Sequence, residues 1–166
     1  MAVVLAKTGC RVTEALTITQ EDLLLDEGFI RLTNRKGGKT TVVPIDPETV
    51  QMIQRLQFID RNTSQFLFAS SRTRNQLTRE RIRRKVREAA TQTGVMEKGE
   101  TRFHKKFTPH TFRTVFTTQM RNQRMPDHIL QYIRGDSESE TMDIYTRIDR
   151  TQAQQEYLKA IQTLEL

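Results

Sequence analysis

The sequence contains very little cysteine. Cys10 is the only one among 166 residues, so the chain cannot build an internal disulfide framework, and a reducing, cytoplasmic location is expected. The sequence also lacks an apolar run of about 18 residues, which a membrane-spanning helix needs. Its first residues show neither the basic segment nor the small-residue cleavage site of a secretory signal. Internal repeats and long linkers are missing too, so we expect residues 1–166 to form one domain.

Basic residues outnumber acidic ones. Lys and Arg total 27 against 20 Asp and Glu, which gives a net charge of +7. The hydrophobic fraction of 36% and the charged fraction of 28% are typical of a soluble globular protein. A basic surface favours polyanionic partners, with nucleic acid the first expectation and an anionic membrane surface a distant second.

The hydrophobic pattern predicts a mainly α-helical fold with one small antiparallel β-sheet. Residues 29–33 and 40–45 read as short strands, and the turn between them is rich in glycine and cations, which is typical of a β-hairpin. Asp46–Pro47, Thr78 and Thr108–Pro109 mark helix starts. Helices are expected at 2–8, 11–16, from 47, at 78–91, from 109, at 128–133 and at 152–166, with one more around Tyr145 that Ser137 and Glu140 would cap.

The helix expected at residues 78–91 is rich in arginine. Its apolar stripe of Ile82, Val86 and Ala89 would face the core, and most other positions from Arg79 to Arg87 are basic. Such a charge run is either a solvated face or a surface that follows DNA phosphates, and both interpretations stay open.

Four segments carry residues suited to chemistry on a phosphate. They are, in order, Thr8-Gly9-Cys10-Arg11-Val12-Thr13-Glu14-Ala15-Leu16; Lys36-Gly37-Gly38-Lys39 followed by Val42-Val43-Pro44-Ile45; Pro109-His110-Thr111-Phe112-Arg113; and Gly135-Asp136-Ser137 through Thr141 to Ile144-Tyr145. In this order they resemble the T-G-x-R-x-x-E-x-L, lysine-hairpin, H-x-x-R and nucleophile segments of the tyrosine recombinases, the phage integrase family. The resemblance covers the chain from Thr8 to Tyr145.

This resemblance implies the catalytic domain of a site-specific DNA recombinase, or integrase. In that family a tyrosine attacks a DNA phosphodiester, which gives a 3′-phosphotyrosine and a free 5′-hydroxyl, without a metal ion or another cofactor. A 5′-hydroxyl of the partner duplex then reseals the strand. The implied partners are double-stranded DNA and further copies of the protein in a tetramer, which places the protein with the nucleoid in the cytoplasm.

Three of the matching residues suit a phosphate that gains negative charge. By the resemblance, Arg11 and Arg113 would stabilise that charge, because a planar guanidinium can bind two phosphate oxygens at once. His110 lies three residues before Arg113, so both side chains are expected on one helical face. His110 would donate to the phosphate or act as a general base.

The nucleophile and the general acid follow from the same resemblance. Tyr145 would attack the phosphate, and its phenol needs help to lose a proton because its ordinary pKa is about 10. Lys36, on the glycine turn, would protonate the departing 5′-oxygen. Lys39 is the alternative lysine on that turn.

Asp136 departs from the family pattern, which has His or sometimes Trp at this position. A carboxylate repels a phosphate unless it is protonated or paired with an arginine. Three explanations are open: Asp136 orients Arg113 or His110, it swings away, or the enzyme is weak or inactive.

Each of these residues also has an ordinary structural interpretation. Arg11 could simply pair with Glu14 in a helix, and His110 could be a capping or core histidine. Cys10 is expected to pack rather than react, and His104 and His128 are expected to be surface residues. Tyr132 and Tyr157 are the rival tyrosines, but neither follows the segment that begins at Gly135.

Two other functions remain as alternatives. One is a catalytically impaired DNA-binding remnant of the same fold, and the other is a type IB topoisomerase, which uses the same tyrosine chemistry without strand exchange. The family's N-terminal DNA-clamping (core-binding) domain is expected to be absent from this chain. Residues 152–166 are a candidate for exchange between neighbouring subunits, or else an ordinary helix that packs on its own domain.

Overall fold

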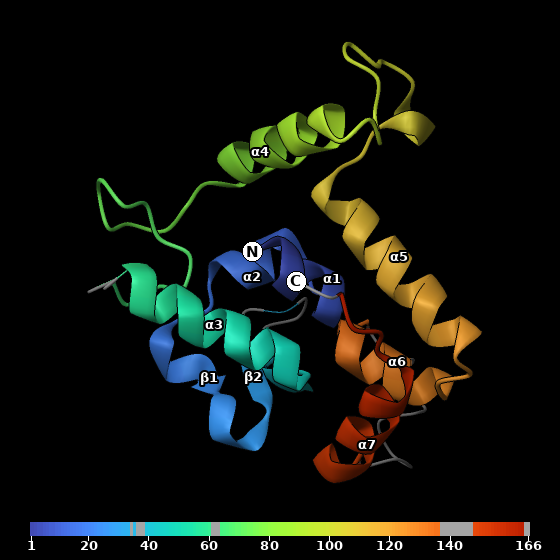
Figure 1. The fold of residues 1–166 in the computed structure, drawn as a ribbon. Coiled ribbons are helices and arrows are strands. Elements are labelled where there is room, and N and C mark those ends of the chain that lie inside the picture. Colours follow the sequence, from blue (N-terminus) through green and yellow to red (C-terminus); the bar gives the residue numbers. More distant parts are fainter. Residues whose placement is uncertain (34, 36–38, 61–63, 137–147, 165–166) are drawn as a thin grey trace.

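The computed structural model describes residues 1–33, 35, 39–60, 64–136 and 148–164. It confirms the mainly helical fold with a small sheet (Figure 1). None of the described helices is long and apolar enough to cross a bilayer. The helices are α1 (Ala2–Thr8), α2 (Val12–Leu16), α3 (Pro47–Asp60), α4 (Arg79–Gln92), α5 (Pro109–Asn122), α6 (Asp127–Arg134) and α7 (Arg150–Ala160), with short 3₁₀ turns at Gln20–Asp22, Leu25–Glu27 and Phe103–Lys105.

The sheet has three antiparallel strands in the order β1 (Leu23–Leu24), β2 (Phe29–Leu32) and β3 (Thr41–Pro44). The predicted hairpin is confirmed: Ile30 pairs with Val43, and both side chains are fully buried. β1 was not predicted, because two residues are too few to show an alternating pattern.

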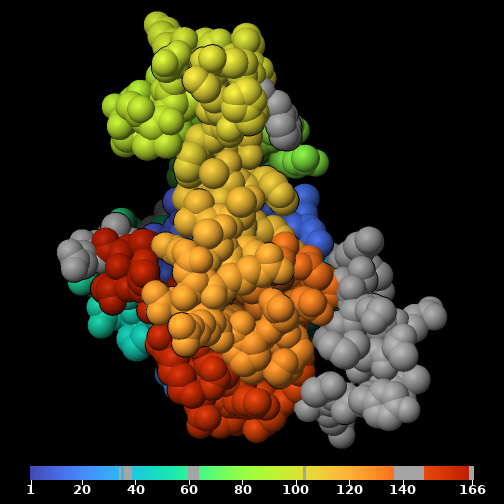
Figure 2. Space-filling model, turned by 90° about the vertical axis from the view of Figure 1, so that its right-hand side faces the viewer, coloured from blue at the N-terminus to red at the C-terminus, as the bar shows by residue number. Residues whose placement is uncertain are grey.

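The core is formed where α1, α5, α6 and α7 pack around the sheet. α5 runs along one whole face of the molecule, from the segment 95–107 down to α6 and α7 (Figure 2). Leu5 of α1 and Phe116 and Met120 of α5 have no exposed surface, as expected where two helices pack closely. This packing places the start of α5 beside the turn between α1 and α2.

The predicted helix starts are confirmed by their hydrogen bonds. The Asp46 carboxylate accepts from the Thr49 amide at 3.1 Å, and the Thr78 hydroxyl accepts from the Arg81 amide at 3.3 Å. The Thr108 amide donates to the Thr111 hydroxyl at 3.0 Å. Each bond satisfies a polar group that the first turn of a helix, or the residue before it, would otherwise leave without a partner.

The expected apolar stripe of α4 is partly wrong. Ile82 is buried and Val86 is half-buried, but Ala89 is exposed and Ala90 is buried in its place. These four residues line an apolar groove of about 310 Å³ between α4 and the starts of α1 and α5.

The prediction of where the C-terminal helix ends is also wrong. It begins at Arg150, where the Asp149 carboxylate accepts from the Thr151 amide at 3.0 Å, and it ends at Ala160. Beyond it, the Gln162 carbonyl accepts from Lys7 and the Leu164 amide donates to Glu48 at 2.9 Å. These contacts with distant residues hold the last described residues on their own domain.

Lys7 connects α1 to the start of α3 and to this C-terminal segment. Its side chain is 1% exposed, and its Nζ lies 2.6 Å from Asp46 Oδ2 and 2.7 Å from Glu48 Oε2. It also donates to the Gln162 carbonyl at 2.5 Å. A buried ammonium with two carboxylates fixes three parts of the chain at one point.

Candidate active site

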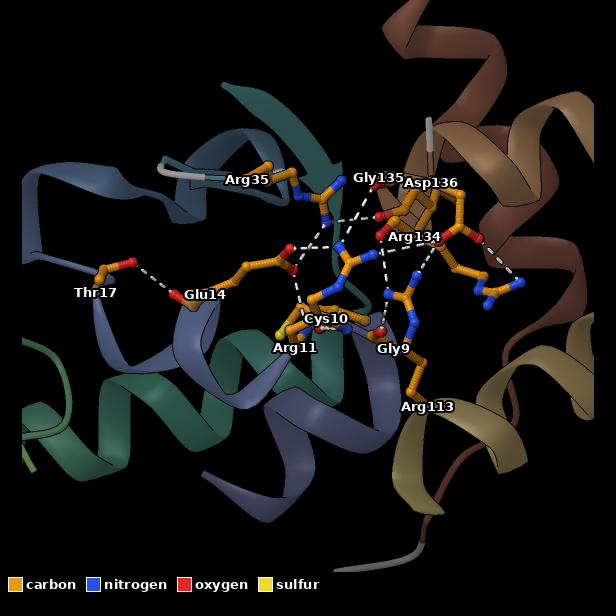
Figure 3. Close-up of polar contacts among 12 residues, drawn as sticks. Gly9, Cys10, Arg11, Glu14, Thr17, Arg35, Arg113, Arg134, Gly135 and Asp136 are labelled. Atoms are coloured by element: carbon orange, nitrogen blue, oxygen red, sulfur yellow. Dashed lines mark hydrogen bonds and ion pairs between the residues drawn. The ribbon is translucent and has the colours of Figure 1, made fainter. Parts of the chain in front are cut away.

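Three of the predicted site residues meet where α2 begins, α5 begins and α6 ends (Figure 3). Arg11 is the residue before the first turn of α2, and its extended backbone follows the left-handed turn at Gly9. Arg113 lies in the second turn of α5. Asp136 follows Gly135, whose left-handed backbone ends α6.

Arg113 is held tightly in place. Its Nη1 donates to the carbonyls of Gly9 at 2.7 Å and Arg134 at 2.8 Å, and its Nη2 donates to Asp136 Oδ1. Its side chain is 4% exposed. Burial lowers the pKa of the guanidinium, and the nearby Asp136 carboxylate partly offsets this lowering. The arrangement fixes both the direction and the charge of this side chain.

Arg11 is more accessible than Arg113. Its Nη1 donates to Glu14 Oε1 at 2.8 Å, and its Nη2 lies 3.6 Å from Asp136 Oδ1. Its side chain is 35% exposed. The salt bridge to Glu14, expected as the ordinary interpretation, therefore exists, and the same guanidinium also faces Asp136.

Asp136 lies between the two guanidiniums. Its Oδ1 contacts Arg113 Nη2 and faces Arg11 Nη2, while its Oδ2 lies 3.1 Å from Arg134 Nη1. An acid at this position is thus paired with arginines on three sides, which lowers the cost of its charge. Its contact with Arg113 fits an orienting role.

Arg35 is a member of this cluster that the sequence interpretation missed. Its side chain is buried and donates to the carbonyls of Tyr132 at 3.2 Å and Ile133 at 2.8 Å, at the end of α6. Its Nη2 also lies 3.7 Å from Glu14 Oε2. Burial lowers its pKa, and Glu14 counters that effect. A cation at a helix C-terminus is stabilised by the helix dipole, but a basic residue in a turn gives no sequence signal for such burial.

A groove of about 640 Å³ opens beside the cluster. Of the predicted site residues, Arg11, His110 and Arg113 line it, and Arg79 and Arg83 of α4 lie on its wall. Among the described residues, those that line the groove include no acid. Its basic members are Arg11, Arg79, Arg83, His104, Lys106, His110 and Arg113. The groove can therefore hold a polyanion next to the two phosphate-binding candidates.

The two histidines in this groove come from different parts of the chain. His110 is exposed on the first turn of α5, three residues before the buried Arg113. His104, expected to be an ordinary surface residue, is exposed and lines the same groove. Only the fold could reveal this, because nothing in the local sequence links His104 to the predicted site.

Lys36, Tyr145 and the proposed capping pair Ser137 and Glu140 lie outside the described residues. The structure does describe the neighbours of the lysine turn, where the Arg35 amide donates to the Lys39 carbonyl at 3.1 Å. Asp136 is the last described residue before Tyr145.

The remaining candidates have ordinary surroundings. Cys10 is buried, and burial raises the pKa of its thiol to about 11, so it packs as expected. The Tyr132 hydroxyl donates to the Val42 carbonyl at 2.9 Å, and Tyr157 has no exposed surface. Within the described part of the chain, no group of three or more His, Cys, Asp or Glu residues is placed to hold a metal ion.

Comparisons with known proteins agree with this geometry. The model of the phage integrase family matches residues 1–152. Tyrosine recombinase XerD of Vibrio cholerae serotype O1 is 30% identical over 154 residues, which cover 89% of this chain and 48% of that protein. The crystal structure of XerA recombinase superposes with a TM-score of 0.71 at 27% identity, over 95% of this chain and 56% of that one. XerH recombinase, in a pre-cleavage complex with its difH substrate, superposes with a TM-score of 0.67 at 21% identity, over 87% of this chain and 40% of that one.

The chain spans about half the length of the curated relatives that it matches. The family match extends from α1 into α7 and includes the turn that presents Arg11, the helix that carries Arg113 and the segment that contains Tyr145. The chain belongs to the phage integrase family and has the fold of its tyrosine recombinase catalytic domains.

Proposed function

We propose that residues 1–166 are one catalytic domain of a site-specific recombinase that cuts and rejoins DNA through a 3′-phosphotyrosine. One observation carries the proposal: Arg11 and Arg113 come from distant segments and converge beside a basic groove that His110 also lines. This arrangement suits a phosphodiester, because fixed guanidiniums stabilise the charge that develops on its oxygens.

In the proposed reaction the Tyr145 hydroxyl oxygen attacks the phosphorus and the bond to the 5′-oxygen breaks. The phenol proton passes to a base, for which His110 is the candidate, and Lys36 gives a proton to the leaving 5′-oxygen. Rejoining is the reverse step, in which a 5′-hydroxyl displaces the tyrosine. Neither step is an oxidation or a reduction.

The described tyrosines support Tyr145 as the nucleophile. The chain has three tyrosines. Tyr157 is fully buried, and burial raises its pKa well above the ordinary value, which disfavours the reactive phenolate. The Tyr132 hydroxyl donates a hydrogen bond to the Val42 carbonyl, and burial raises the pKa of Tyr132 as well.

Double-stranded DNA is the proposed substrate. Arg79 and Arg83 of α4 and Lys106 line the groove next to the proposed active site, where they would contact backbone phosphates without selecting a sequence. XerH, a site-specific recombinase that shares the fold, is described in complex with its difH substrate. By the same resemblance we propose a tetramer on two duplexes and a cytoplasmic location with the nucleoid.

A second candidate follows from Asp136. Because its carboxylate lies between Arg11 and Arg113, the domain could bind DNA and yet leave the phosphate uncut. This is the impaired remnant, and it differs from the first proposal in one measurable property, covalent attachment to DNA.

The test uses supercoiled plasmid, for which no target site has to be known. The protein is incubated with plasmid in EDTA, quenched with denaturant and analysed for relaxed DNA, beside Tyr145→Phe and the matched control Tyr132→Phe. Relaxation by the wild type and by Tyr132→Phe, but not by Tyr145→Phe, supports the proposal. Relaxation by Tyr145→Phe contradicts it, and DNA binding without relaxation by any variant favours the remnant.

A further inference from the structure

Arg134, the last residue of α6, touches the proposed active site in two ways. Its carbonyl accepts from Arg113 Nη1 at 2.8 Å, and its own Nη1 lies 3.1 Å from Asp136 Oδ2. Its side chain is 22% exposed, and its Nε has no hydrogen-bond acceptor among the described residues. Its ion pair with Asp136 is therefore the main polar contact of this guanidinium in the described part of the chain.

The two oxygens of Asp136 have different partners. Oδ1 contacts Arg113 Nη2 and lies 3.6 Å from Arg11 Nη2, whereas Oδ2 faces Arg134. Oδ1 thus contacts the donors that a DNA phosphate needs in the proposed reaction. A carboxylate and a phosphate cannot both use these donors without repelling each other.

We propose that Arg134 and Asp136 form a gating pair, in which Asp136 holds Arg11 and Arg113 in place until DNA arrives and Arg134 retains the carboxylate when the phosphate displaces it. This inference rests on the proposed function and assigns Arg134 as a positioning residue of that site. It also explains how the chain accommodates an acid where the family has His or sometimes Trp.

The charged groups around Asp136 determine how the loss of Arg134 changes DNA binding. Among the described residues, the charged groups that face it are Arg11, before α2, Arg113 on α5 and Arg134 on α6. Without Arg134, the only guanidiniums left to Asp136 in the part of the chain that the structure describes are the two that the phosphate requires. Asp136 then competes with DNA, and the loss of Arg134 matters only while residue 136 carries a negative charge.

The experiment is a double-mutant cycle on DNA binding. Wild type, Arg134→Gln, Asp136→Asn and the double variant are titrated with one duplex oligonucleotide at fixed salt, by fluorescence anisotropy. We expect Arg134→Gln to raise Kd by roughly fivefold or more, and by less than about twofold when Asp136→Asn is already present.

Equal losses of affinity in both backgrounds would overturn the proposal, because Arg134 would then be an ordinary phosphate contact or a structural residue. Weaker binding by Asp136→Asn than by the wild type would also overturn it. Arg134→Lys keeps the charge and should restore most of the affinity. This variant distinguishes the loss of a charge from misfolding. Melting temperatures are measured for every variant.

Arg121 and Asp127 provide the matched control. They form an ion pair at 3.6 Å, their side chains are 62% and 72% exposed, and neither lines the groove. Arg121→Gln and Asp127→Asn should leave Kd unchanged. DNA binding does not require cleavage, so the two proposals can fail separately. If Arg134→Gln and Asp136→Asn are coupled in Kd but the wild type does not relax plasmid, only the proposed reaction is refuted. If the wild type relaxes plasmid but the two substitutions are not coupled in Kd, only the gating pair is refuted.

Discussion

The Arg113 guanidinium donates through Nη1 to the carbonyl of Gly9 at 2.7 Å. This bond joins α5 to the turn that presents Arg11. Gly9 has a φ of 59°, and a methyl group on its Cα would collide with the ring of Phe116, one turn after Arg113 on α5. Gly9 therefore sets the relative position of the two arginines.

Gly9→Ala should destabilise the protein strongly. The left-handed backbone costs an alanine about 1 kcal/mol, and displacing Phe116 adds about 1–3 kcal/mol, so we expect a loss of about 2–4 kcal/mol in the free energy of unfolding. Urea denaturation measures this. Gly94→Ala is the control, because Gly94 has a φ of +74° but nothing within 4 Å of the added carbon. Equal losses for the two variants would contradict the role given to Phe116.

Arg11→Ala should slow DNA cleavage far more than it weakens the fold. Removing one preorganised donor to the phosphate costs roughly a hundredfold or more in rate. Arg113→Ala should cost at least as much and should also lower the melting temperature, because Gly9 and Arg134 lose their hydrogen-bond donor. The initial rate of plasmid relaxation is measured beside Arg121→Ala. A decrease in rate of less than tenfold for Arg11→Ala would contradict a role for Arg11 in stabilising the phosphate.

The two interpretations of the basic helix α4 can now be separated. Arg79 and Arg83 line the groove, whereas Arg84 and Lys85 lie 3.6 Å and 3.0 Å from Glu88 on the exposed surface. Removing a side chain that binds a phosphate should reduce the salt slope of log Kd by about 1, so Arg79→Ala and Arg83→Ala should flatten it and Arg84→Ala should not. Equal slopes for all three variants would indicate a solvated face.

Cys10 should be unreactive in the folded protein. Burial raises the pKa of its thiol from 9.0 to about 11, so the folded state keeps its proton between these values while the unfolded state loses it. This contribution to stability is complete below pH 9 and is lost as the pH rises toward 11. Iodoacetamide at about pH 8 should label Cys10 only after unfolding. In Cys10→Ala, stability should fall less steeply over the alkaline range, and rapid labelling of the native protein would contradict the burial.

Lys7→Met tests the buried ion cluster. It leaves Asp46 and Glu48 without their cation, and such a loss costs about 3–5 kcal/mol of unfolding free energy. The segment after α7 should also loosen, which hydrogen exchange at the Leu164 amide would detect. Lys159→Met is the control, because Lys159 pairs with Glu156 at 2.6 Å but is 69% exposed. A similar small effect for both variants would show that burial of Lys7 adds nothing.

Local chemistry made much of this fold predictable. The turn at Gly9, the cap at Asp46 and the hairpin of β2 and β3 each follow from residues close together in sequence. The end of α7 could not be predicted, because Lys7 and Glu48 hold Gln162 and Leu164 from far along the chain. The burial of Arg35 against α6 likewise depends on a distant contact.

The site could be predicted only in part for the same reason. Motifs located Arg11, His110 and Arg113, and the structure brings all three to one groove. Asp136 stood out as a departure from the family pattern, but its pairing with three arginines from separate elements is a property of the fold. The roles of Lys36 and Tyr145 stay predictions.

The most direct test of tyrosine chemistry at this site is to locate the covalent bond to DNA. The protein is trapped on nicked duplex DNA in EDTA, digested with nuclease and protease, and its peptides are analysed by mass spectrometry. The assignment of Tyr145 as the nucleophile predicts a nucleotide phosphate on the peptide that contains this residue, and no adduct when Arg113→Ala is used. An adduct on another residue, or one that persists in Tyr145→Phe, would contradict it.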